Sequence, residues 1–167
     1  MLETQGESGL FTTPKKLYKT LAFAEAVTWT LLIAGLAVKA TVGAPQTLLT
    51  IVGGIHGLVF LTYATISALV GVNQRWGLFR TALAVALAIV PYATIPFERS
   101  VEKRGRLQGE WRKTTSEDPR DGLLVDRLYR WFLNRPALLV IALIAVVAAI
   151  FAALLIVGPP GGWPKSE

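Results

Sequence analysis

The 167-residue chain contains no cysteine, which excludes disulfide bonds, thiolate metal sites and a cysteine nucleophile. It contains a single histidine, which excludes a zinc or haem site built from several imidazole ligands. It also lacks a glycine-rich phosphate loop and the strand-to-helix serine motif of hydrolases. We therefore expect no catalytic residue, no cofactor and no metal, and we predict that the protein is not an enzyme.

Polar side chains are also missing from the longest apolar stretch, residues 137–157. About 20 helical residues span a hydrocarbon core of roughly 30 Å, so this stretch is long enough to cross a membrane. Residues 17–38, 47–70 and 78–97 are apolar over similar lengths. Hydrophobic residues make up 53% of the chain and the mean hydropathy is +0.50, which is typical of membrane proteins. The sequence therefore predicts an all-α integral membrane bundle with four transmembrane helices.

The breaks between these stretches suggest how the chain is organised. Gly43 and Pro45 predict a turn after the first helix, and the short link 71–77 predicts that the second and third helices are antiparallel neighbours. Pro91 predicts a kink inside the third helix. We expect an N-terminal tail, a three-helix membrane unit, a basic loop, a fourth transmembrane helix and a C-terminal tail, over residues 1–14, 15–100, 101–135, 136–158 and 159–167.

The basic loop has two parts, of which residues 99–120 are charged and expected to be solvated. The second part, residues 122–134, has the spacing of an amphipathic helix. Its apolar side carries Leu124, Leu128, Trp131 and Phe132, and its polar side carries Asp126, Arg127, Arg130 and Asn134. Such a helix lies flat at the membrane surface, although packing against a partner protein is an open alternative.

Charge indicates the partners and the orientation. The net charge is +6, and ten of the seventeen Lys and Arg residues lie within residues 99–135, so anionic lipid headgroups are the expected partners and nucleic acid is not. With four crossings, this loop and Lys39 share a side that holds eleven basic residues, against six on the other side. The positive-inside rule then predicts a multi-pass membrane protein with residues 99–135 cytoplasmic and both termini outside. Lys15, Lys16 and Lys19 oppose this orientation. Tryptophan prefers the headgroup level, so Trp76, Trp131 and Trp163 are predicted interfacial anchors.

Two ionisable side chains, Glu25 and His56, lie well inside predicted helices. A charge at the centre of a membrane helix costs at least about 2.5 kcal/mol, so such residues usually face the protein interior and are paired. We predict that Glu25 and His56 are in contact, directly or through one water, with Thr28, Tyr63 and Ser67 as possible supporting groups. This intramembrane polar pair either fixes helix packing or binds a proton, an ion or a ligand headgroup.

The second helix also carries a packing signal. Gly53 and Gly57 are four residues apart, a spacing that lets another helix approach closely. His56, Phe60, Tyr63 and Ser67 follow one another at helical spacing, which predicts a stripe that faces the first or the third helix.

Several of these segments resemble a known family. The segment Phe23-AEAVTWTLLI with its acidic residue, Lys39, Gly54-IHGLVFLTY, Arg75 with Trp76, and Ala93-TIPFERS are similar to the YdzA-like small three-span bacterial membrane proteins of unknown function. The resemblance covers about residues 15–100 and departs from the family at residues 95–98, where Ile-Pro-Phe-Glu replaces a usual Pro-Phe-Gly. It implies a fold rather than an activity, and its members look like modules fused to or placed beside transporters.

Three functional hypotheses remain open. The first is a non-enzymatic accessory or scaffolding subunit of a larger membrane complex, such as a respiratory or transport assembly. The second is a small proton- or ion-coupled carrier or channel that works as a homo-oligomer through Glu25 and His56. The third is a lipid-binding membrane protein.

Overall fold

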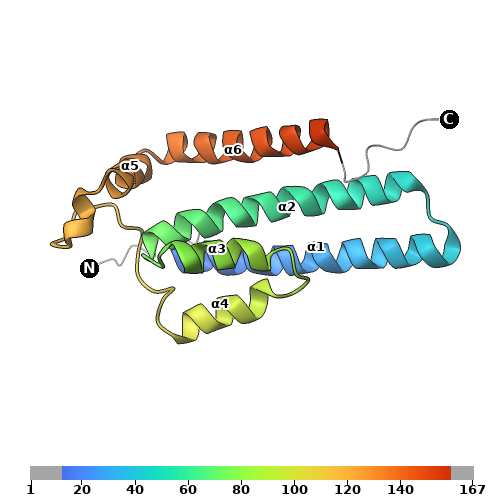
Figure 1. Ribbon diagram of the computed structural model, residues 1–167, viewed down its shortest axis with the longest axis horizontal. Coiled ribbons are helices and arrows are strands. Elements are labelled where there is room, and N and C mark those ends of the chain that lie inside the picture. Colours follow the sequence, from blue (N-terminus) through green and yellow to red (C-terminus); the bar gives the residue numbers. More distant parts are fainter. Residues whose placement is uncertain (1–12, 159–167) are drawn as a thin grey trace, which may run out of the picture.

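The computed structural model describes residues 13–158, and every regular element in that range is a helix (Figure 1). Three of these helices are long and apolar enough to cross a membrane: α1 (Pro14–Val42), α2 (Gln46–Asn73) and α6 (Pro136–Val157). The predicted all-α membrane bundle is confirmed. The shorter elements are α3 (Leu78–Leu87), α4 (Thr94–Lys103), the 3₁₀ helix η1 (Pro119–Gly122) and α5 (Leu124–Leu133).

Helices α1 and α2 form a long antiparallel hairpin. The side chain of Thr13 caps the start of α1 by accepting a 3.2 Å hydrogen bond from the Lys16 N–H, and Pro14 occupies the first helical position. Gly43 ends α1 in the left-handed conformation, with φ at 73°, and donates its N–H to the Lys39 carbonyl. The turn predicted at Gly43 and Pro45 is confirmed, because α2 begins directly after Pro45.

The single third crossing predicted over residues 78–97 is wrong. The stretch is divided between α3 and α4, each of 10 residues, and a helix of that length covers only about 15 Å, roughly half of a hydrocarbon core. Pro91 lacks the N–H that would continue α3, and Tyr92 is left-handed, with φ at 64°. The proline that predicted a kink therefore lies in a reversal of the chain.

Ion pairs show that α4 returns to the end of the bundle at which α1 begins. Lys15 Nζ lies 2.6 Å from Glu102 Oε1, and Lys19 Nζ lies 2.9 Å from Glu102 Oε2. Arg75, just after α2, pairs with Asp118 and Asp121 at the same end. With four crossings, the start of α1 and the loop 104–123 would lie on opposite sides of the membrane. In the structure they lie at the same end of the bundle, so this prediction is wrong. We call this end of the bundle the basic end.

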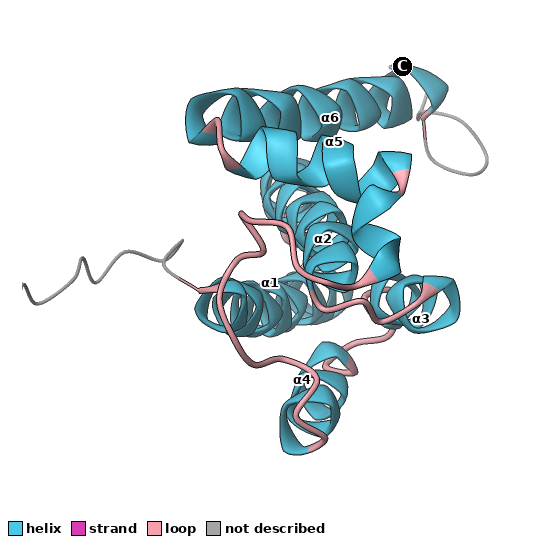
Figure 2. Ribbon diagram, turned by 90° about the vertical axis from the view of Figure 1, so that its left-hand side faces the viewer, coloured by secondary structure: helices cyan, strands magenta, loops and turns pink. Residues whose placement is uncertain are grey.

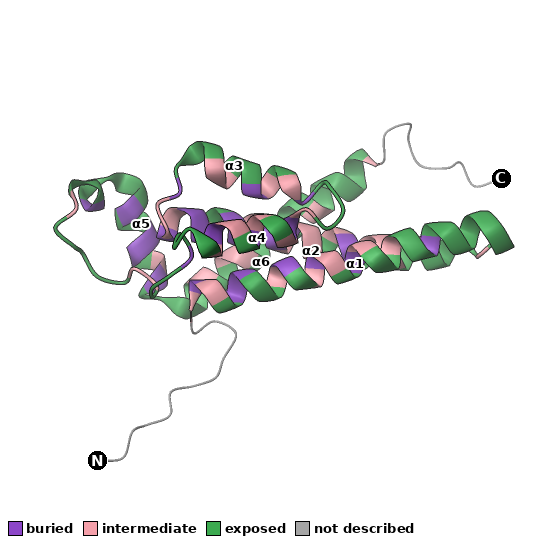
Figure 3. Cartoon of the chain, turned by 90° about the horizontal axis from the view of Figure 1, so that it is seen from below, coloured by how far each residue is buried: buried purple, intermediate pink, exposed green. Residues whose placement is uncertain are grey.

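The buried side chains are concentrated toward the basic end, and the opposite half of α1 is mostly exposed (Figure 3). Trp76 is only 4% exposed and donates its indole N–H to the Arg106 carbonyl at 2.6 Å. Its ring meets Tyr18 edge-on, with ring centroids 5.5 Å apart. Trp76 is thus a core residue and the expectation that it is an interfacial anchor is wrong. Trp131 is 44% exposed, and its anchoring stays a prediction. Trp163 lies outside the described residues.

The closest backbone approach on α2 is at Gly71, where an added Cβ would overlap the side chain of Thr81 on α3. The predicted small-residue pair, Gly53 and Gly57, does not require such close packing. A Cβ on Gly57 would make an ordinary 3.5 Å contact with Phe151 of α6, and a Cβ on Gly53 would meet nothing within 4 Å. Gly71 is therefore the glycine on α2 that close packing requires.

Most of residues 99–120 are exposed, as expected for a solvated segment, but the segment is also fixed to the bundle. Leu107 is fully buried, and Asn73 donates its side-chain N–H to the Glu110 carbonyl. Helix α5 is seen end-on in Figure 1 and lengthwise in Figure 2, so it runs across the bundle axis. Two residues of its predicted polar side, Asp126 and Arg130, are buried, whereas Arg127 and Asn134 are exposed, as are Leu124, Leu128 and Trp131.

Helix α6 is attached loosely compared with α1 and α2. It leaves α5 at the basic end, crosses α2 and ends toward the opposite end of the bundle (Figure 1). Val147 is its only buried residue, and the side chains along the rest of α6 are exposed or half-buried.

Candidate intramembrane site and surface cluster

The Glu25 side chain is fully buried between α1 and the start of α4. It lies six residues beyond Lys19, or about 9 Å further along the helix, which is well inside the apolar stretch of α1. Thr94 Oγ1 is 3.2 Å from Glu25 Oε2, whereas Oε1 has no hydrogen-bond partner within the described residues. This is a carboxyl group with one oxygen held and one available.

The chain reversal between α3 and α4 creates this environment. The Trp29 indole N–H donates to the Ala88 carbonyl at 3.1 Å, which satisfies a backbone group that a continuous helix would have bonded internally. Thr94 is the first residue of α4, so the carboxyl group of Glu25 lies at a helix N-terminus, where a partial positive charge favours an anion. The broken third helix thus supplies both the hydroxyl and the dipole beside Glu25.

His56 packs against α1 and not against the carboxyl group. Its Nδ1 lies 3.1 Å from Thr28 Oγ1, and its ring centroid lies 4.5 Å from that of Trp29. Thr28 also donates its hydroxyl to the Glu25 backbone carbonyl at 3.0 Å. A hydroxyl has one hydrogen, and that of Thr28 is donated to the Glu25 carbonyl. In the contact between Thr28 and His56 the hydrogen is therefore carried by His56 Nδ1.

No direct hydrogen bond joins the side chains of Glu25 and His56 among residues 13–158, so the predicted direct contact is wrong. Thr28 connects the two residues instead, through the backbone of Glu25. The predicted supporting role of Thr28 thus has a geometric basis, and a bridging water stays a prediction.

The other two predicted supporting residues form a separate group nearer the basic end. Tyr63 and Tyr18 are both fully buried and their hydroxyl oxygens are 2.7 Å apart. Ser67 is buried one helical turn further along α2. The stripe that includes His56 and Tyr63 does face α1, as one of the two predicted alternatives required.

Chemically, the Glu25 side chain can exist in two forms. It can be a protonated carboxyl group, or it can be a carboxylate that the Thr94 hydroxyl and the start of α4 stabilise. Within the described range, no three His, Cys, Asp or Glu side chains come together as a metal site would need.

A second polar constellation lies at the basic end, and we call it the arginine–aspartate cluster. Its centre is Asp121, 6% exposed, whose Oδ1 pairs with Arg75 at 2.5 Å, Arg130 at 3.0 Å and Arg112 at 3.1 Å. The Ser116 N–H and hydroxyl donate to Asp121 Oδ2 at 2.6 and 2.8 Å. One carboxylate thus binds arginines from three separate segments of the chain.

Arg112 joins this cluster to the end of α2. Its guanidinium donates to the Val72 and Asn73 carbonyls, both at 2.8 Å, and pairs with Asp126 of α5 at 2.5 Å. The last carbonyls of a helix have no partner within the helix and carry partial negative charge, so an arginine is well suited to this position. Arg112 therefore connects α2 with α5, and through α5 with α6.

Hydrogen bonding and charge lower the pKa of two carboxyl groups at this end, those of Asp121 and Glu102. The Ser116 hydrogen bonds, followed by the Arg130 and Arg75 charges, bring the pKa of Asp121 to about 2. Hydrogen bonds from Lys15 and then Lys19 bring the pKa of Glu102 to about 2. Both groups are therefore ionised at neutral pH, and their ion pairs are intact there.

Sequence reasoning missed the residues on which both sites depend. Thr94 was hidden inside a stretch that was interpreted as one continuous span. Arg112 lies within residues 99–120, which were interpreted as solvated, and Asp121 lies between that segment and the predicted amphipathic helix, although Pro119 with acidic and serine neighbours is a turn signal. Helical spacing predicted the apolar side of α5, which is exposed, but it did not predict that Asp126 and Arg130 are buried.

Comparison with known proteins agrees with a membrane protein whose activity is not established. Residues 15–103 match the family described as "Domain of unknown function (DUF3817)". The protein named "Putative membrane protein SCO5905", from Streptomyces coelicolor, is 34% identical over 93 residues, which are 55% of this chain and 11% of that protein. No solved structure matches the chain. The match supports the expected membrane family of unknown function but does not carry the label YdzA-like. Because the match covers more than half of its length, the chain belongs to the DUF3817 family.

Proposed function

We propose that this protein is a non-enzymatic accessory subunit of a larger membrane complex, in which the family unit is a membrane module joined to other components. One observation carries this proposal. In the Streptomyces coelicolor relative, the similar segment is only 11% of the protein, so there the unit is combined with a much longer chain.

The structure supports an attachment role for α6. The helix offers no side chain that donates or accepts a hydrogen bond and buries only Val147. It is apolar all round, so its outer side is suited to lipid or to another transmembrane helix. Ala145 and Ala149 are exposed and one helical turn apart, which permits close approach by a partner. The respiratory or transport nature of the complex remains part of the hypothesis.

Affinity purification from native membranes tests the proposal. Full-length protein should co-purify with foreign subunits detectable by native mass spectrometry. Ala145→Phe should reduce that co-purification, since a large side chain prevents close helix approach. Phe23→Ala, on an exposed position of α1, is the control. A symmetric homo-oligomer without foreign subunits would contradict the accessory role.

We also propose an orientation that follows from the corrected arrangement. The basic end holds Lys15, Lys16, Lys19, Arg75, Arg80 and the ten basic residues of 99–135, which is fifteen of the seventeen Lys and Arg in the chain. Lys39 lies at the opposite end, and Lys165 follows α6 in the sequence. By the positive-inside rule the basic end is cytoplasmic, including the start of α1.

Thiol labelling checks this orientation, because the chain has no cysteine of its own. Thr115→Cys should resist an impermeant reagent in intact cells, whereas Ala44→Cys, between α1 and α2, should react. Rapid labelling of Thr115→Cys would overturn the orientation.

A second candidate function is proton or ion coupling at Glu25. It is favoured by the unpartnered, buried Oε1 atom of that side chain. Protein in liposomes should then conduct protons or a monovalent cation, and Glu25→Gln should abolish the flux. Equal flux in the two proteins would exclude a coupling role for Glu25.

A further inference from the structure

An apolar groove runs between α6 on one side and α1 and α2 on the other. Its volume is about 690 Å³, within the usual range for a ligand site. Its walls include Leu21 of α1, Leu58, Thr62 and Thr65 of α2, and Ile144 and Ala148 of α6. The groove exists because α6 crosses α2 at an angle and does not follow the α1–α2 hairpin (Figures 1 and 2).

The groove lining is apolar even where it contains threonines. Thr62 Oγ1 donates to the Leu58 carbonyl and Thr65 Oγ1 to the Leu61 carbonyl, both at 2.8 Å within α2. The hydroxyl hydrogens of these two residues are thus already used, and Thr20 is the one further polar side chain in the lining, so a ligand in the groove meets mainly hydrocarbon. A polar ligand would lose its hydrogen bonds with water there, whereas an acyl chain would lose none.

The length and position of the groove match one leaflet of a membrane. Along α6 the lining extends from Val140 to Phe151, or about 16 Å, which is half of a hydrocarbon core of roughly 30 Å. The groove begins near Leu17, one turn into α1, and therefore at the basic end. An acyl chain that enters from this end would extend to the middle of the membrane.

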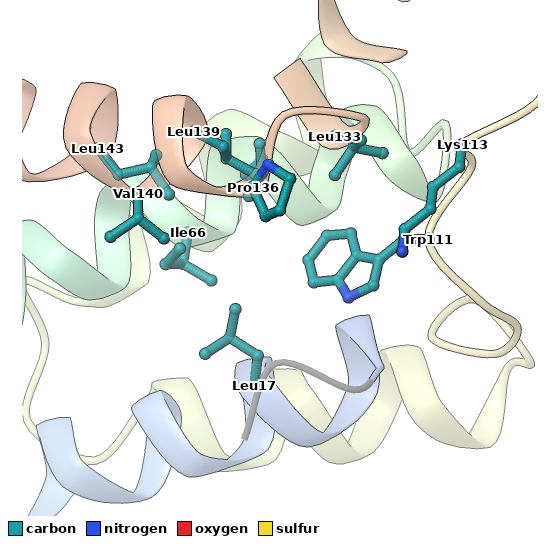
Figure 4. A pocket seen from close by; sticks show the side chains of 10 residues that line it. Leu17, Ile66, Trp111, Lys113, Leu133, Pro136, Leu139, Val140 and Leu143 are labelled. Atoms are coloured by element: carbon teal, nitrogen blue, oxygen red, sulfur yellow. The ribbon is translucent and has the colours of Figure 1, made fainter. Parts of the chain in front are cut away.

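A smaller hollow of about 130 Å³ continues the groove toward the basic end and shares Leu17, Ile66, Val140 and Leu143 with it. Figure 4 shows Lys113 and Trp111 at the loop side of this hollow. Lys113 is exposed and makes no ion pair within residues 13–158, unlike Arg75, Arg112 and Arg130 of the neighbouring cluster. An unpaired ammonium group therefore lies where the headgroup of a lipid in the groove would be.

We propose that this groove binds one anionic phospholipid, with an acyl chain between α6 and the α1–α2 hairpin and its phosphate beside Lys113. One wall of the groove and the lysine at its headgroup end lie outside the family match, since α6 and Lys113 both follow residue 103. The proposal does not depend on the accessory role, because it requires no partner protein.

The test is native mass spectrometry of the full-length protein in detergent with added phosphatidylglycerol or phosphatidylcholine. Wild-type protein should retain one phosphatidylglycerol molecule. Lys113→Gln should weaken phosphatidylglycerol binding about fivefold, as expected for one lysine near an anionic headgroup, and leave phosphatidylcholine binding unchanged. Lys113→Arg should retain binding. Lys103→Gln, which removes an exposed lysine from α4, is the matched control.

A second pair of variants tests the groove itself. Ala148→Phe fills the groove from α6 and should abolish retention of both lipids, whereas Ala149→Phe, on the neighbouring exposed position outside the lining, should not. Thermal unfolding of each variant confirms that it is folded. Equal lipid retention by the two alanine variants would overturn the proposal. So would the absence of lipid from wild-type protein, or a dimer that Ala148→Phe separates, since a second copy would then occupy the groove.

Discussion

Helices α1 and α6 are both long and apolar enough to cross a membrane, yet they are held in the protein by different means. Helix α1 buries Tyr18, Glu25 and Thr28, and each makes a polar contact with another helix or with its own backbone. Helix α6 has no such side chain, and its position is set at one end, where α5 joins the arginine–aspartate cluster.

The difference shows how association inside a membrane is specified. Apolar surface alone gives little preference for a helix over lipid, so position must come from polar contacts, close packing or the connecting segment. Helix α1 uses the first two of these, and α6 uses the third. The following predictions test this contrast, in order of decreasing effect.

The largest effect is expected for Arg112→Ala, which removes one of the links between α2 and the α5–α6 region; the hydrogen bond from the Tyr129 hydroxyl to Asn73 Oδ1 is another. The substitution leaves the Val72 and Asn73 carbonyls and the Asp126 carboxylate without this partner. We expect a loss of about 3 kcal/mol, because breaking a largely buried ion pair leaves uncompensated charge. Thermal unfolding and limited proteolysis within residues 104–135 measure it.

Arg104→Ala is the control, since Arg104 is exposed and makes no ion pair in the described part of the chain. Arg112→Lys should be intermediate, because an ammonium group cannot reproduce the fork of contacts. A loss as small as that of the control would show that α5 is held by other contacts.

A smaller effect is expected for the contact between Glu25 and Thr94, which joins α1 to α4. In a double-mutant cycle, Glu25→Leu with Thr94→Val should show a coupling of about 1 kcal/mol, the usual value of one hydrogen bond. The same cycle for Glu25→Leu with His56→Leu should show less than about 0.5 kcal/mol, because the two side chains make no direct bond. A larger coupling energy for Glu25 with His56 than for Glu25 with Thr94 would support the contact between Glu25 and His56 that the sequence predicts.

The sequence predicted the part of this site that depends on residue type and helical spacing. Acidic and imidazole groups in apolar helices had to face the interior, and both Glu25 and His56 are buried. It did not predict the partner of Glu25, because that partner is set by the reversal at Tyr92. A left-handed non-glycine residue has no clear sequence signal, and Pro91 is equally compatible with a kink.

The same limit applies to the basic end. Periodicity placed the amphipathic helix α5 correctly, although Arg127, which was assigned to its polar side, is exposed together with Leu124 and Leu128. The direction in which each side of α5 faces depends on where the chain returns after α4. Because the number of crossings was predicted wrongly, the loop was placed on the opposite side of the membrane from the start of α1. Ion pairs such as Lys15 with Glu102 are 87 positions apart in the sequence and carry no local pattern.

Acid should loosen the α6 attachment, whereas the contact of α1 with α2 through the Tyr18 and Tyr63 hydroxyls should remain in place. The pKa of Asp121, about 2, lies below its ordinary value of 3.8, mainly because Ser116 donates two hydrogen bonds. The stabilisation from this group is therefore complete above about pH 4 and is lost as the pH falls toward 2. Thermal unfolding of wild-type protein between pH 5 and 2 should show this decrease. Asp121→Asn should show a flatter profile over the same range, and parallel profiles would assign the decrease to other carboxyl groups.

The smallest effect on the family unit, residues 15–103, is expected from removal of α6. Truncation after Asn134 retains the cluster, α5 and both polar contacts of Glu25 and Thr28, while it removes a helix with a single buried residue. The truncated protein should insert and unfold with a loss of no more than about 1 kcal/mol, because α6 contributes packing but no interhelical hydrogen bond. A helix that is only attached at one end should also be dispensable for the coupling between Glu25 and Thr94, so the double-mutant cycle should give the same value in the truncated chain. Failure of residues 1–134 to fold would mean that α6 is part of the core, and the contrast between the two helices would then be wrong.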